Sequence, residues 1–517
     1  MKAAVLALAL ALMGVAWAEL APPERSYKIL MLLPVSSKSH RNVFLPVAEA
    51  LADRGHKIVM LVNHPPASKH PNVLEINHGL PDFRVENLNM FETRGNPAAV
   101  FGLFQKALPA IARKLYKVPK VKELYDKRKE FDLIVINHLF NEAAYPFAHE
   151  MPFITIATPG VDYRQSAVLG NVLNPSYAPN YMQSYPAPMS MLHRFVNTIQ
   201  HIMFAVNWRH WSIVPAVQKE ISAQFPDLPL LLDIERNQSL TLMNSHFTMN
   251  DVLPLLPSQV EVGAMHCRPG KPLPEDLESW ISGAGSEGVV YFSLGSVAQG
   301  QSMPTKYRDM FVEAFKQLKQ RVIWKYEEVL EGISDNVLMR KWLPQQDILA
   351  HPNVRVFISH GGLLSTQESF YHSTPVLAIP IFADQPKNGM NIQNNGLGLM
   401  LEWEELTVEL IVNSLQEIIS NPKYKARAAE VRAPLRDQPE SPKDRAVFWT
   451  EYVIRHKGAP RLRSPAATLS WVEFLMLDVL LALHVAVVVA VYVLRRLVGA
   501  VCSRVLGSRS AGKRKRE

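Results

Sequence analysis

The stretch YKILMLLPVSSKSHRNVFLPVAEALADRGHKIVMLV, residues 27–62, decides the fold. Its opening apolar run over 27–35 is typical of a strand that is buried on both faces of a parallel sheet. After a polar loop, apolar residues recur at helical spacing over 43–51 and stop at Gly55, a natural helix end. The next apolar run, 57–62, completes a predicted strand–helix–strand unit.

The same alternation continues along the chain and predicts two α/β domains. Further strand-like runs follow in the first half, and four more alternate with helical patterns in the second half. A linker rich in Pro and Gly, 254–288, separates a first domain at 19–253 from a second at 289–457. Because this alternation favours mostly parallel sheets, we expect ligands at the carboxyl ends of the strands.

Both ends of the chain read as membrane-targeting segments. Residues 1–18 combine Lys2, an apolar run and a closing Ala-x-Ala, which predicts a secretory signal peptide. Residues 470–494 are apolar enough to cross a bilayer, and the basic tail at 495–517 favours a cytosolic C-terminus. We therefore expect a single-pass type I protein of the endoplasmic-reticulum membrane with lumenal domains. The lysines near the end resemble dilysine retrieval signals, and a generic stop-transfer cluster is the alternative.

Charge and cysteine content exclude several classes of protein. The formal charge is +8, but eight basic residues and one acidic residue lie from Arg495 onward, which leaves +1 for the rest. A nucleic-acid partner is therefore excluded. Cys267 and Cys502 would lie on opposite sides of the membrane, so they cannot pair, and two cysteines are too few for a Cys-based zinc ribbon. Asn237 begins a usable glycosylation sequon, which predicts a glycoprotein.

Two further patterns need interpretation. GAGSEG at 283–288 matches the Gly-x-Gly-x-x-Gly dinucleotide fingerprint, but it precedes a strand instead of following one, so we predict a flexible loop. The stretch 189–211 is rich in Met and aromatic residues and predicts an amphipathic helix. We expect that helix to face the core, and contact with a membrane surface is the alternative.

The chemistry is concentrated in WLPQQDILAHPNVRVFISHGGLLSTQE, residues 342–368. Within it, 358–363 predicts a strand end, a glycine turn and a helix start. Free N–H groups, the positive helix end and His360 would favour a diphosphate there. Ser365 lies in the first helical turn and can donate a hydroxyl. Glu368, one turn further, is placed to accept hydrogen bonds from a ribose hydroxyl pair.

Three more side chains complete the predicted site. Trp342 offers a flat face on which a base can stack. Asp384 and Gln385 follow the next predicted strand and supply an acceptor and an amide for sugar hydroxyls. Each residue alone is weak evidence, but their order along the chain predicts a site for a nucleotide sugar.

This segment closely resembles the donor-binding signature of the family 1 glycosyltransferases. The whole chain is similar to the UDP-glucuronosyltransferases of the endoplasmic reticulum and to UDP-glycosyltransferases of invertebrates. The likeness includes FSLGS at 292–296 and AVFWTEYVIRHKG at 446–458, and HGGLLSTQE at 360–368 is the invertebrate form. The resemblance implies a GT-B fold, with two Rossmann-like domains facing a cleft, followed by a C-terminal transmembrane helix.

The resemblance also implies an activity. Such enzymes move glucuronate or glucose from a UDP-sugar to a hydroxyl of small lipophilic acceptors with inversion, take part in detoxification, and need no metal or other cofactor. It implies donor contacts by Ser296, Ser365, His360 and the Gly362 amide around the diphosphate, Trp342 and Gln345 beside uracil, Glu368 at the ribose, and Asp384 with Gln385 at the sugar. Leu364 departs from the pattern, because many members place an Asn there against the phosphates.

By the same resemblance, His40 is the general base that takes the proton of the acceptor hydroxyl. An imidazole suits that task because its pKa lies near 6.5. Asn137 stands where the family commonly has an Asp that orients the base; an amide can orient His40 but cannot offset its positive charge. Glu142 and His138 are possible substitutes. The sequence thus predicts an altered catalytic pair.

Other interpretations remain open. The altered pair is also compatible with a catalytically silent UDP-sugar-binding membrane protein or partner subunit, whereas an adhesion ectodomain would not explain the ordered donor segment. The donor sugar is undecided, with Arg41 a candidate to bind a glucuronate carboxylate. The expected partners are a UDP-sugar, a lipophilic acceptor and membrane lipid, and the chain could form homo- or hetero-oligomers.

Overall fold

The computed structural model describes residues 20–81, 89–94, 96–180, 183, 185–186, 188–249, 252–296 and 298–513. The predicted signal peptide lies outside these residues, as does the very end of the basic tail. The chain forms two compact units, one ending at Arg463 and the other beginning at Ser464, and each is described by itself.

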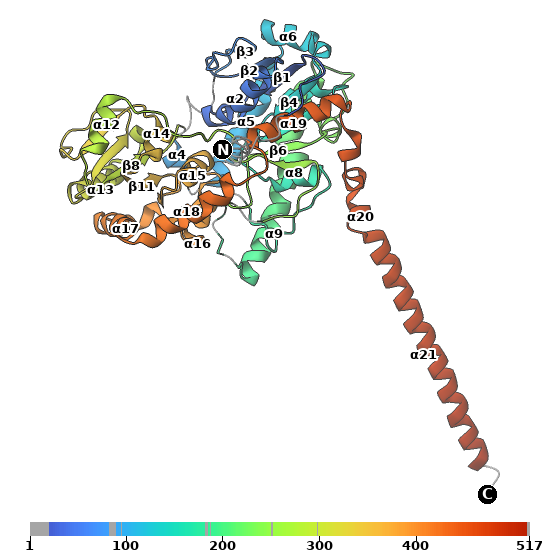
Figure 1. Cartoon of the computed structure of the whole chain (residues 1–517). Helices are drawn as coiled ribbons and strands as arrows, with labels where there is room; N and C mark the ends of the chain where they lie inside the picture. Colours follow the sequence, from blue (N-terminus) through green and yellow to red (C-terminus); the bar gives the residue numbers. More distant parts are fainter. Residues whose placement is uncertain are drawn as a thin grey trace, which may run out of the picture. The chain divides into compact units, whose positions relative to one another are not determined.

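The first domain is built on a seven-stranded parallel sheet in the order β3-β2-β1-β4-β5-β6-β7 (Figure 1). Its strands are β1 (Lys28–Leu33), β2 (Lys57–Val62), β3 (Val73–Asn77), β4 (Leu133–Asn137), β5 (Phe153–Ala157), β6 (Thr241–Met243) and β7 (Gln259–Glu261). The helices are α2 (Lys38–Asp53), α4 (Met90–Thr93), α5 (Pro97–Leu115), α6 (Pro119–Asp126), α7 (Tyr145–Ala148), α8 (Tyr163–Val168), α9 (Met191–Val206), α10 (Ile213–Ser222) and α11 (Leu231–Glu235). The predicted unit over 27–62 is confirmed.

Strand β1 shows why this sheet forms. Ile29 and Met31 join the hydrophobic cluster that contains α2, while Leu30 and Leu32 join the cluster that contains α5 and α10. Alternate side chains are therefore buried on opposite faces, as expected for a central parallel strand covered by helices on both sides.

The second domain repeats the plan with a six-stranded parallel sheet in the order β10-β9-β8-β11-β12-β13. Its strands are β8 (Val289–Ser293), β9 (Arg321–Lys325), β10 (Val337–Arg340), β11 (Val354–Ser359), β12 (Val376–Ala378) and β13 (Gly398–Met400). The helices are α12 (Glu275–Ser282), α13 (Thr305–Lys316), α14 (Gln345–Ala350), α15 (Leu363–Tyr371), α16 (Gln385–Asn394), α17 (Val408–Ser420) and α18 (Pro422–Arg436). Two Rossmann-like domains are thus present, as predicted.

The domain limits differ from the sequence-based ones at two places. The predicted linker 254–288 contains β7, which pairs with the first sheet, and α12, which packs on the second. Helix α19 (Pro442–Arg455), predicted as part of the second domain, packs on α2 of the first (Figure 1). There Glu451 accepts hydrogen bonds from Arg54 Nε at 2.6 Å and from the His56 ring at 3.0 Å.

The short helix α4 of the first domain makes a second contact with the second domain. Its Met90 and Phe91 are buried in the core of the second domain, where the Phe91 ring meets Trp403 edge-on at 5.0 Å. Arg94 pairs with Glu404 of that domain. A segment of the first domain therefore completes the core of the second.

Helix α9 meets the core through Phe204 near its end but turns most of its apolar residues outward, so the expectation of a core-facing helix was wrong for most of its length. Its buried residues are Asn197 and His201, while Met191, Phe195 and Ile199 are exposed. The helical pattern was read correctly, but amphipathicity alone does not tell which face turns inward.

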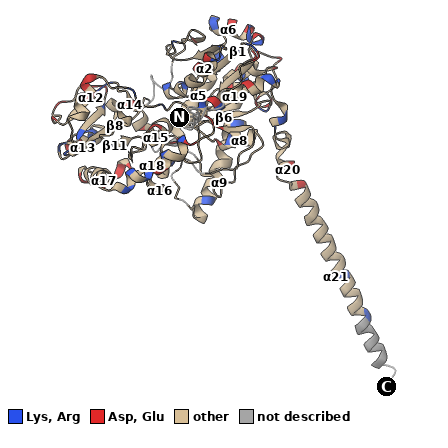
Figure 2. Ribbon diagram, viewed as in Figure 1, with Lys and Arg blue, Asp and Glu red and all other residues tan. Residues whose placement is uncertain are grey.

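The second unit contains α20 (Trp471–Phe474) and the long helix α21 (Leu477–Lys513). Residues Leu477–Arg504 of α21 are long and apolar enough to cross a membrane, and Figure 2 shows few charged residues along them. The helix starts later than the predicted span 470–494, because Met476 adopts a left-handed conformation with φ 52° between α20 and α21.

Candidate functional site

The glycine turn between β11 and α15 forms as the sequence predicted. Gly361 has φ +76°, a conformation that a side chain would strain, and its N–H donates to Ser359 Oγ at 3.1 Å. Gly362 is the N-cap of α15 and offers no capping side chain, while the Asp384 carboxylate accepts a hydrogen bond from the Leu363 N–H. The other N–H groups of the first turn of α15 receive no cap from Gly362 and are consequently available to a ligand.

His360 is seated between two glycines. A Cβ on Gly295 would lie 2.7 Å from His360 Cε1, and one on Gly362 would lie 2.5 Å from Nε2. Burial, together with the nearby charge of Lys325, lowers the pKa of His360 to about 4. Its buried Nδ1 has no hydrogen-bond partner in the described part of the chain. A neutral imidazole with unused hydrogen-bonding capacity therefore sits beside the helix N-terminus.

Gln345, Ser365 and Glu368 are brought together in one hydrogen-bonded group. The Gln345 amide donates to Glu368 Oε2 at 2.6 Å and to Ser365 Oγ at 3.0 Å, and the Tyr291 hydroxyl donates to Gln345 Oε1 at 3.1 Å. Burial raises the pKa of Glu368 to about 7, against the opposing effect of the Gln345 hydrogen bond. The His266 ring lies 3.6 Å from the same carboxylate. Sequence reasoning missed Tyr291 and His266, since neither lies in the motif.

Trp342 and Ser296 lie at the surface of the same edge. The Trp342 side chain is 68% exposed, so its face is open to a stacking base. Ser296 follows β8 and is also exposed. Both positions are compatible with contacts to a ligand lying over the carboxyl ends of β8 and β11.

Asp384 and Gln385 begin α16, but their side chains differ in availability. Gln385 Oε1 accepts hydrogen bonds from the Ile381 and Phe382 N–H groups at 2.8 and 3.1 Å. The oxygen of its amide therefore stabilises the preceding loop. Asp384 Oδ2 accepts from Asn388, whose amide also donates to the Gly361 carbonyl at 2.9 Å. Asn388 thereby ties the glycine turn to α16, a role that the sequence did not reveal.

In the first domain, His40 lies in the first turn of α2. Its N–H donates to the capping Ser37 hydroxyl at 3.1 Å, and its Nδ1 lies 3.5 Å from the amide nitrogen of Asn137. Asn137 ends β4, which neighbours β1 in the sheet, so the two chain segments meet at the carboxyl edge. The two residues named from resemblance are thus adjacent.

Glu142 and His138, the suggested substitutes, are engaged elsewhere. Glu142 Oε1 accepts a hydrogen bond from the Trp208 indole at 2.6 Å, and burial raises its pKa. His138 Nε2 lies 3.0 Å from Asp162, which also pairs with Arg164 at 2.7 Å. Asp162 is a buried carboxylate of this edge that sequence reasoning missed; its position just after β5 is the signal that could have found it.

Arg41 and Asn237 lie outside these groups. Arg41 Nη1 donates to the Pro65 carbonyl at 2.6 Å. Asn237 is exposed, while Ser239 of its sequon is buried and donates to the Gly458 carbonyl at 2.7 Å.

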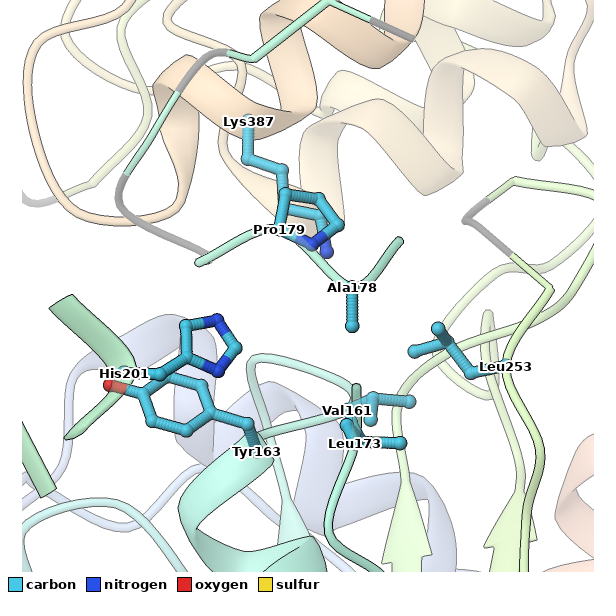
Figure 3. A pocket seen from close by; sticks show the side chains of 8 residues that line it. All are labelled: Val161, Tyr163, Leu173, Ala178, Pro179, His201, Leu253 and Lys387. Atoms are coloured by element: carbon cyan, nitrogen blue, oxygen red, sulfur yellow. The ribbon is translucent and has the colours of Figure 1, made fainter. Parts of the chain in front are cut away.

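A cavity joins the two domains at the carboxyl edge of the first sheet. Gly160 and Ser245 line it from the first domain and Asp384 and Lys387 from the second, enclosing about 600 Å³ including its open mouth. An adjoining pocket contains the stacked rings of Tyr163 and His201 below Lys387 (Figure 3). Loops of the carboxyl edge of the first sheet therefore face the start of α16 across this cavity.

Two hydrogen bonds lie close to this cavity along the chain. Thr158, directly before the cavity-lining loop, donates its hydroxyl to Asn137 Oδ1 at 3.4 Å. Across the domain boundary, the Gln367 amide of α15 donates to the Asn244 carbonyl at 3.0 Å. Leu364 packs against the core of the first domain, which accounts for an apolar residue at this position.

Comparisons with known proteins agree with this architecture. A sequence model described as "UDP-glucoronosyl and UDP-glucosyl transferase" matches residues 83–513. UDP-glycosyltransferase UGT5 of Dactylopius coccus is 37% identical over 90% of this chain and 91% of that protein. The 2-hydroxyacylsphingosine 1-beta-galactosyltransferase of Mus musculus is 28% identical over 91% and 88%. The crystal structure of CalG4, the calicheamicin glycosyltransferase, shares the fold with a TM-score of 0.57 at 17% identity, covering 83% of this chain and 99% of that one. The chain therefore belongs to the UDP-glucoronosyl and UDP-glucosyl transferase family and is a UDP-glycosyltransferase with a GT-B fold.

Proposed function

We propose that this enzyme transfers a hexose, glucuronate or glucose, from a UDP-sugar to a hydroxyl of small lipophilic acceptors at a membrane. The observation behind this proposal is that a loop at the carboxyl edge of the first sheet lines the same interdomain cavity as Asp384 of the second domain, and that Thr158, directly before this loop, is hydrogen-bonded to the Asn137 that lies beside His40. In an inverting transfer, the acceptor oxygen bonds to the anomeric carbon from the face opposite UDP, and UDP leaves with the electron pair of the broken bond. His40 takes the acceptor proton.

The donor would lie over the second sheet. The diphosphate would meet the α15 N-terminus, His360, Ser365 and Ser296; the base would stack on Trp342 near Gln345. Glu368 would accept from the ribose, and Asp384 with the free half of the Gln385 amide would bind the sugar. Support comes from the glycine-capped N-terminus of α15 and from the preformed Gln345–Glu368 pair.

The donor and acceptor are tested together by measuring UDP release from microsomes that contain the full chain. UDP-glucuronate and UDP-glucose are compared over a panel of phenols and steroids, with His40→Ala as the control. Acceptor-dependent release with either donor supports the proposal. Release with neither donor on any acceptor would speak for the second candidate, a silent UDP-sugar-binding protein.

That second candidate is favoured by one observation, the neutral Asn137 beside His40. An amide can hold the imidazole but does not stabilise the imidazolium that forms during transfer. Restoring a carboxylate by Asn137→Asp should therefore raise turnover, most clearly on acceptors with unactivated hydroxyls. If no acceptor gained, the altered pair would not be the limiting feature.

We further propose that the enzyme is a type I protein of the endoplasmic reticulum, with α21 as its span and the catalytic domains in the lumen. Endoglycosidase-sensitive glycan at Asn237, lost in Asn237→Gln, would support this orientation. We also expect the transfer to need no metal ion or cofactor, so that a chelator such as EDTA leaves UDP release unchanged.

A further inference from the structure

The segment that joins the two domains brings a histidine to the carboxylate that we expect to bind the ribose. Residues 262–274, which we call the connector, follow β7 and precede α12. The ring of His266 in the connector lies against α15, with Nε2 3.3 Å from the Leu364 carbonyl oxygen and 3.6 Å from Glu368 Oε1. Its side chain is only 6% exposed. A residue from outside the glycine-turn motif therefore contacts the candidate donor site.

The neighbours of the His266 ring decide where its hydrogen lies. Both oxygen atoms close to Nε2 are hydrogen-bond acceptors, so Nε2 carries the hydrogen. The buried Nδ1 has no hydrogen-bond partner in the described part of the chain, and a hydrogen there would find no acceptor. Burial lowers the pKa of His266 to about 4, although the hydrogen bond to Leu364 acts against this. The ring is therefore neutral and offers a single N–H between Leu364 and Glu368.

The connector holds this ring in place through contacts with α14. The Gln346 amide donates to the His266 carbonyl at 3.1 Å, and its Oε1 accepts a hydrogen bond from the Arg268 N–H at 3.0 Å. The Arg268 guanidinium also forms two hydrogen bonds with the Asp347 carboxylate, at 2.6 and 3.0 Å. The backbone on both sides of the ring is thus tied to the helix whose first residue bonds to Glu368.

The charges around Glu368 leave its ionised form dependent on neutral donors. Among the residues that the structure describes, no Lys or Arg forms an ion pair with it, and Arg268, whose charge favours the ionised form, is itself paired with Asp347. The Cys267 thiol and the Tyr291 hydroxyl stay protonated, because burial and the charge of Glu368 raise the pKa of each. An N–H from a neutral side chain is therefore the support that this carboxylate has.

We propose that His266 is a positioning residue of the donor site, whose N–H orients the Glu368 carboxylate and stabilises it in the ionised form that accepts hydrogen bonds from the ribose. The inference rests on the proposed binding of the ribose by Glu368. The Gln345 amide already holds Oε2 at 2.6 Å, and the His266 N–H is the donor next to Oε1. The distance of 3.6 Å is longer than a hydrogen bond, so a small movement of the carboxylate on ligand binding would complete the contact.

The test compares two ligands that differ only at the ribose. Calorimetry on the full chain in detergent gives the affinities for UDP and for 2′,3′-dideoxy-UDP, which lacks both ribose hydroxyls. His266→Phe keeps the size of the ring but removes its N–H. We expect the UDP affinity of this variant to fall about tenfold, while the affinity for the dideoxy analogue changes by less than about twofold.

Two further variants serve as matched controls. His266→Gln keeps an N–H at the position of Nε2 and should restore most of the UDP affinity. His372→Phe alters another neutral histidine of the second domain, whose ring meets Tyr371, and should leave both affinities unchanged. The ratio of the two affinities is not affected by a misfolded fraction of protein, since that fraction is silent toward both ligands alike.

A double variant shows whether His266 acts through Glu368. In a Glu368→Gln background, His266→Phe should cause no further loss of UDP affinity, because the two residues act through one contact. An equal loss for UDP and the dideoxy analogue, or a full further loss in the Glu368→Gln background, would overturn the inference while leaving UDP binding intact. If the parent bound UDP and the dideoxy analogue equally, the proposed ribose contact would be wrong and the inference with it. A parent that bound no UDP would overturn the proposed function itself.

Discussion

At the scale of single residues, the donor half depends on the fit of the His360 ring between Gly295 and Gly362. Both glycines approach the imidazole more closely than any Cβ could, so the ring position is set by the absence of side chains. Lowering of the His360 pKa to about 4 keeps the ring neutral at physiological pH, and a bound diphosphate would favour its protonated form.

Gly362→Ala tests that fit. Its φ of −61° accepts Ala without strain, so the effect is purely the contact of the new Cβ with His360 Nε2 at 2.5 Å. We expect UDP affinity, measured by calorimetry, to fall about tenfold or more, equivalent to about 1.4 kcal/mol. Gly102→Ala, at a helical position with no atom within 4 Å, is the control and should leave affinity intact. Equal UDP affinities of the parent and of Gly362→Ala would show that UDP binding does not depend on the space beside the His360 ring.

Glu368 links stability to pH. Its folded pKa is about 7, above the value near 4.5 of an unfolded glutamate, so the folded state keeps its proton longer and loses relative stability as pH rises from 4.5 to 7. Glu368→Gln should therefore be more stable than the parent at pH 8, by up to about 3 kcal/mol, with the difference vanishing near pH 4.5. Thermal unfolding across this range measures it. UDP binding should weaken in the same variant, and a difference in stability that is independent of pH would contradict the assignment.

At the scale of elements, α19 packs on the first domain and is held there by the contacts of Glu451 with Arg54 and His56. Although burial acts against it, hydrogen bonds from His56 and Arg54 lower the pKa of Glu451 to about 2. The contribution of this carboxylate is therefore present above pH 4.5 and is lost as pH falls toward 2.

Glu451→Gln should cost about 3 kcal/mol at pH 7, because it leaves the half-buried Arg54 guanidinium without its carboxylate partner. Denaturant unfolding at pH 7 and pH 4 gives the cost and its decline with acidity. Glu430→Gln removes an exposed pair with Arg427 and should change stability by less than about 1 kcal/mol. If Glu451→Gln and Glu430→Gln lowered the free energy of unfolding by the same amount, the contact of α19 with the first domain would not stabilise the fold.

Elements also show what could be predicted from the sequence. The unit 27–62 and the turn after β11 were predicted correctly, because hydrophobic period and glycine position are local signals. The packing partner of α19 and the outward side of α9 could not be read, since a helical pattern does not name the surface it meets. Glu142 was suggested as a partner of His40, but it bonds to Trp208 instead, and the buried Asp162 was missed. The direction in which a loop side chain points depends on long-range packing, which the sequence pattern does not show.

At the scale of the whole molecule, the two domains share both a core contact and a cavity. Phe91 of the first domain packs in the core of the second, while a cavity remains between Gly160 and Asp384, where we propose that substrates bind. The residues that join the domains thus lie apart from those that face the cavity.

Phe91→Ala should destabilise the second domain although the residue precedes it by nearly two hundred positions in the chain. The cavity left beside Trp403 is expected to cost about 3 to 5 kcal/mol. Hydrogen exchange at β8 and β11 would report this loss as faster exchange. Leu74→Ala, at a site that is 57% exposed, should leave those strands unaffected. Unchanged exchange in Phe91→Ala would show that α4 does not support that core.

The most direct test of the account separates donor binding from proton transfer in one variant. His40→Ala should bind UDP with the affinity of the parent, because all the proposed donor contacts lie in the second domain. Its acceptor-dependent UDP release should fall by about 10²-fold or more, the contribution expected of a general base. Unchanged turnover in His40→Ala would contradict the central claim that this imidazole takes the acceptor proton.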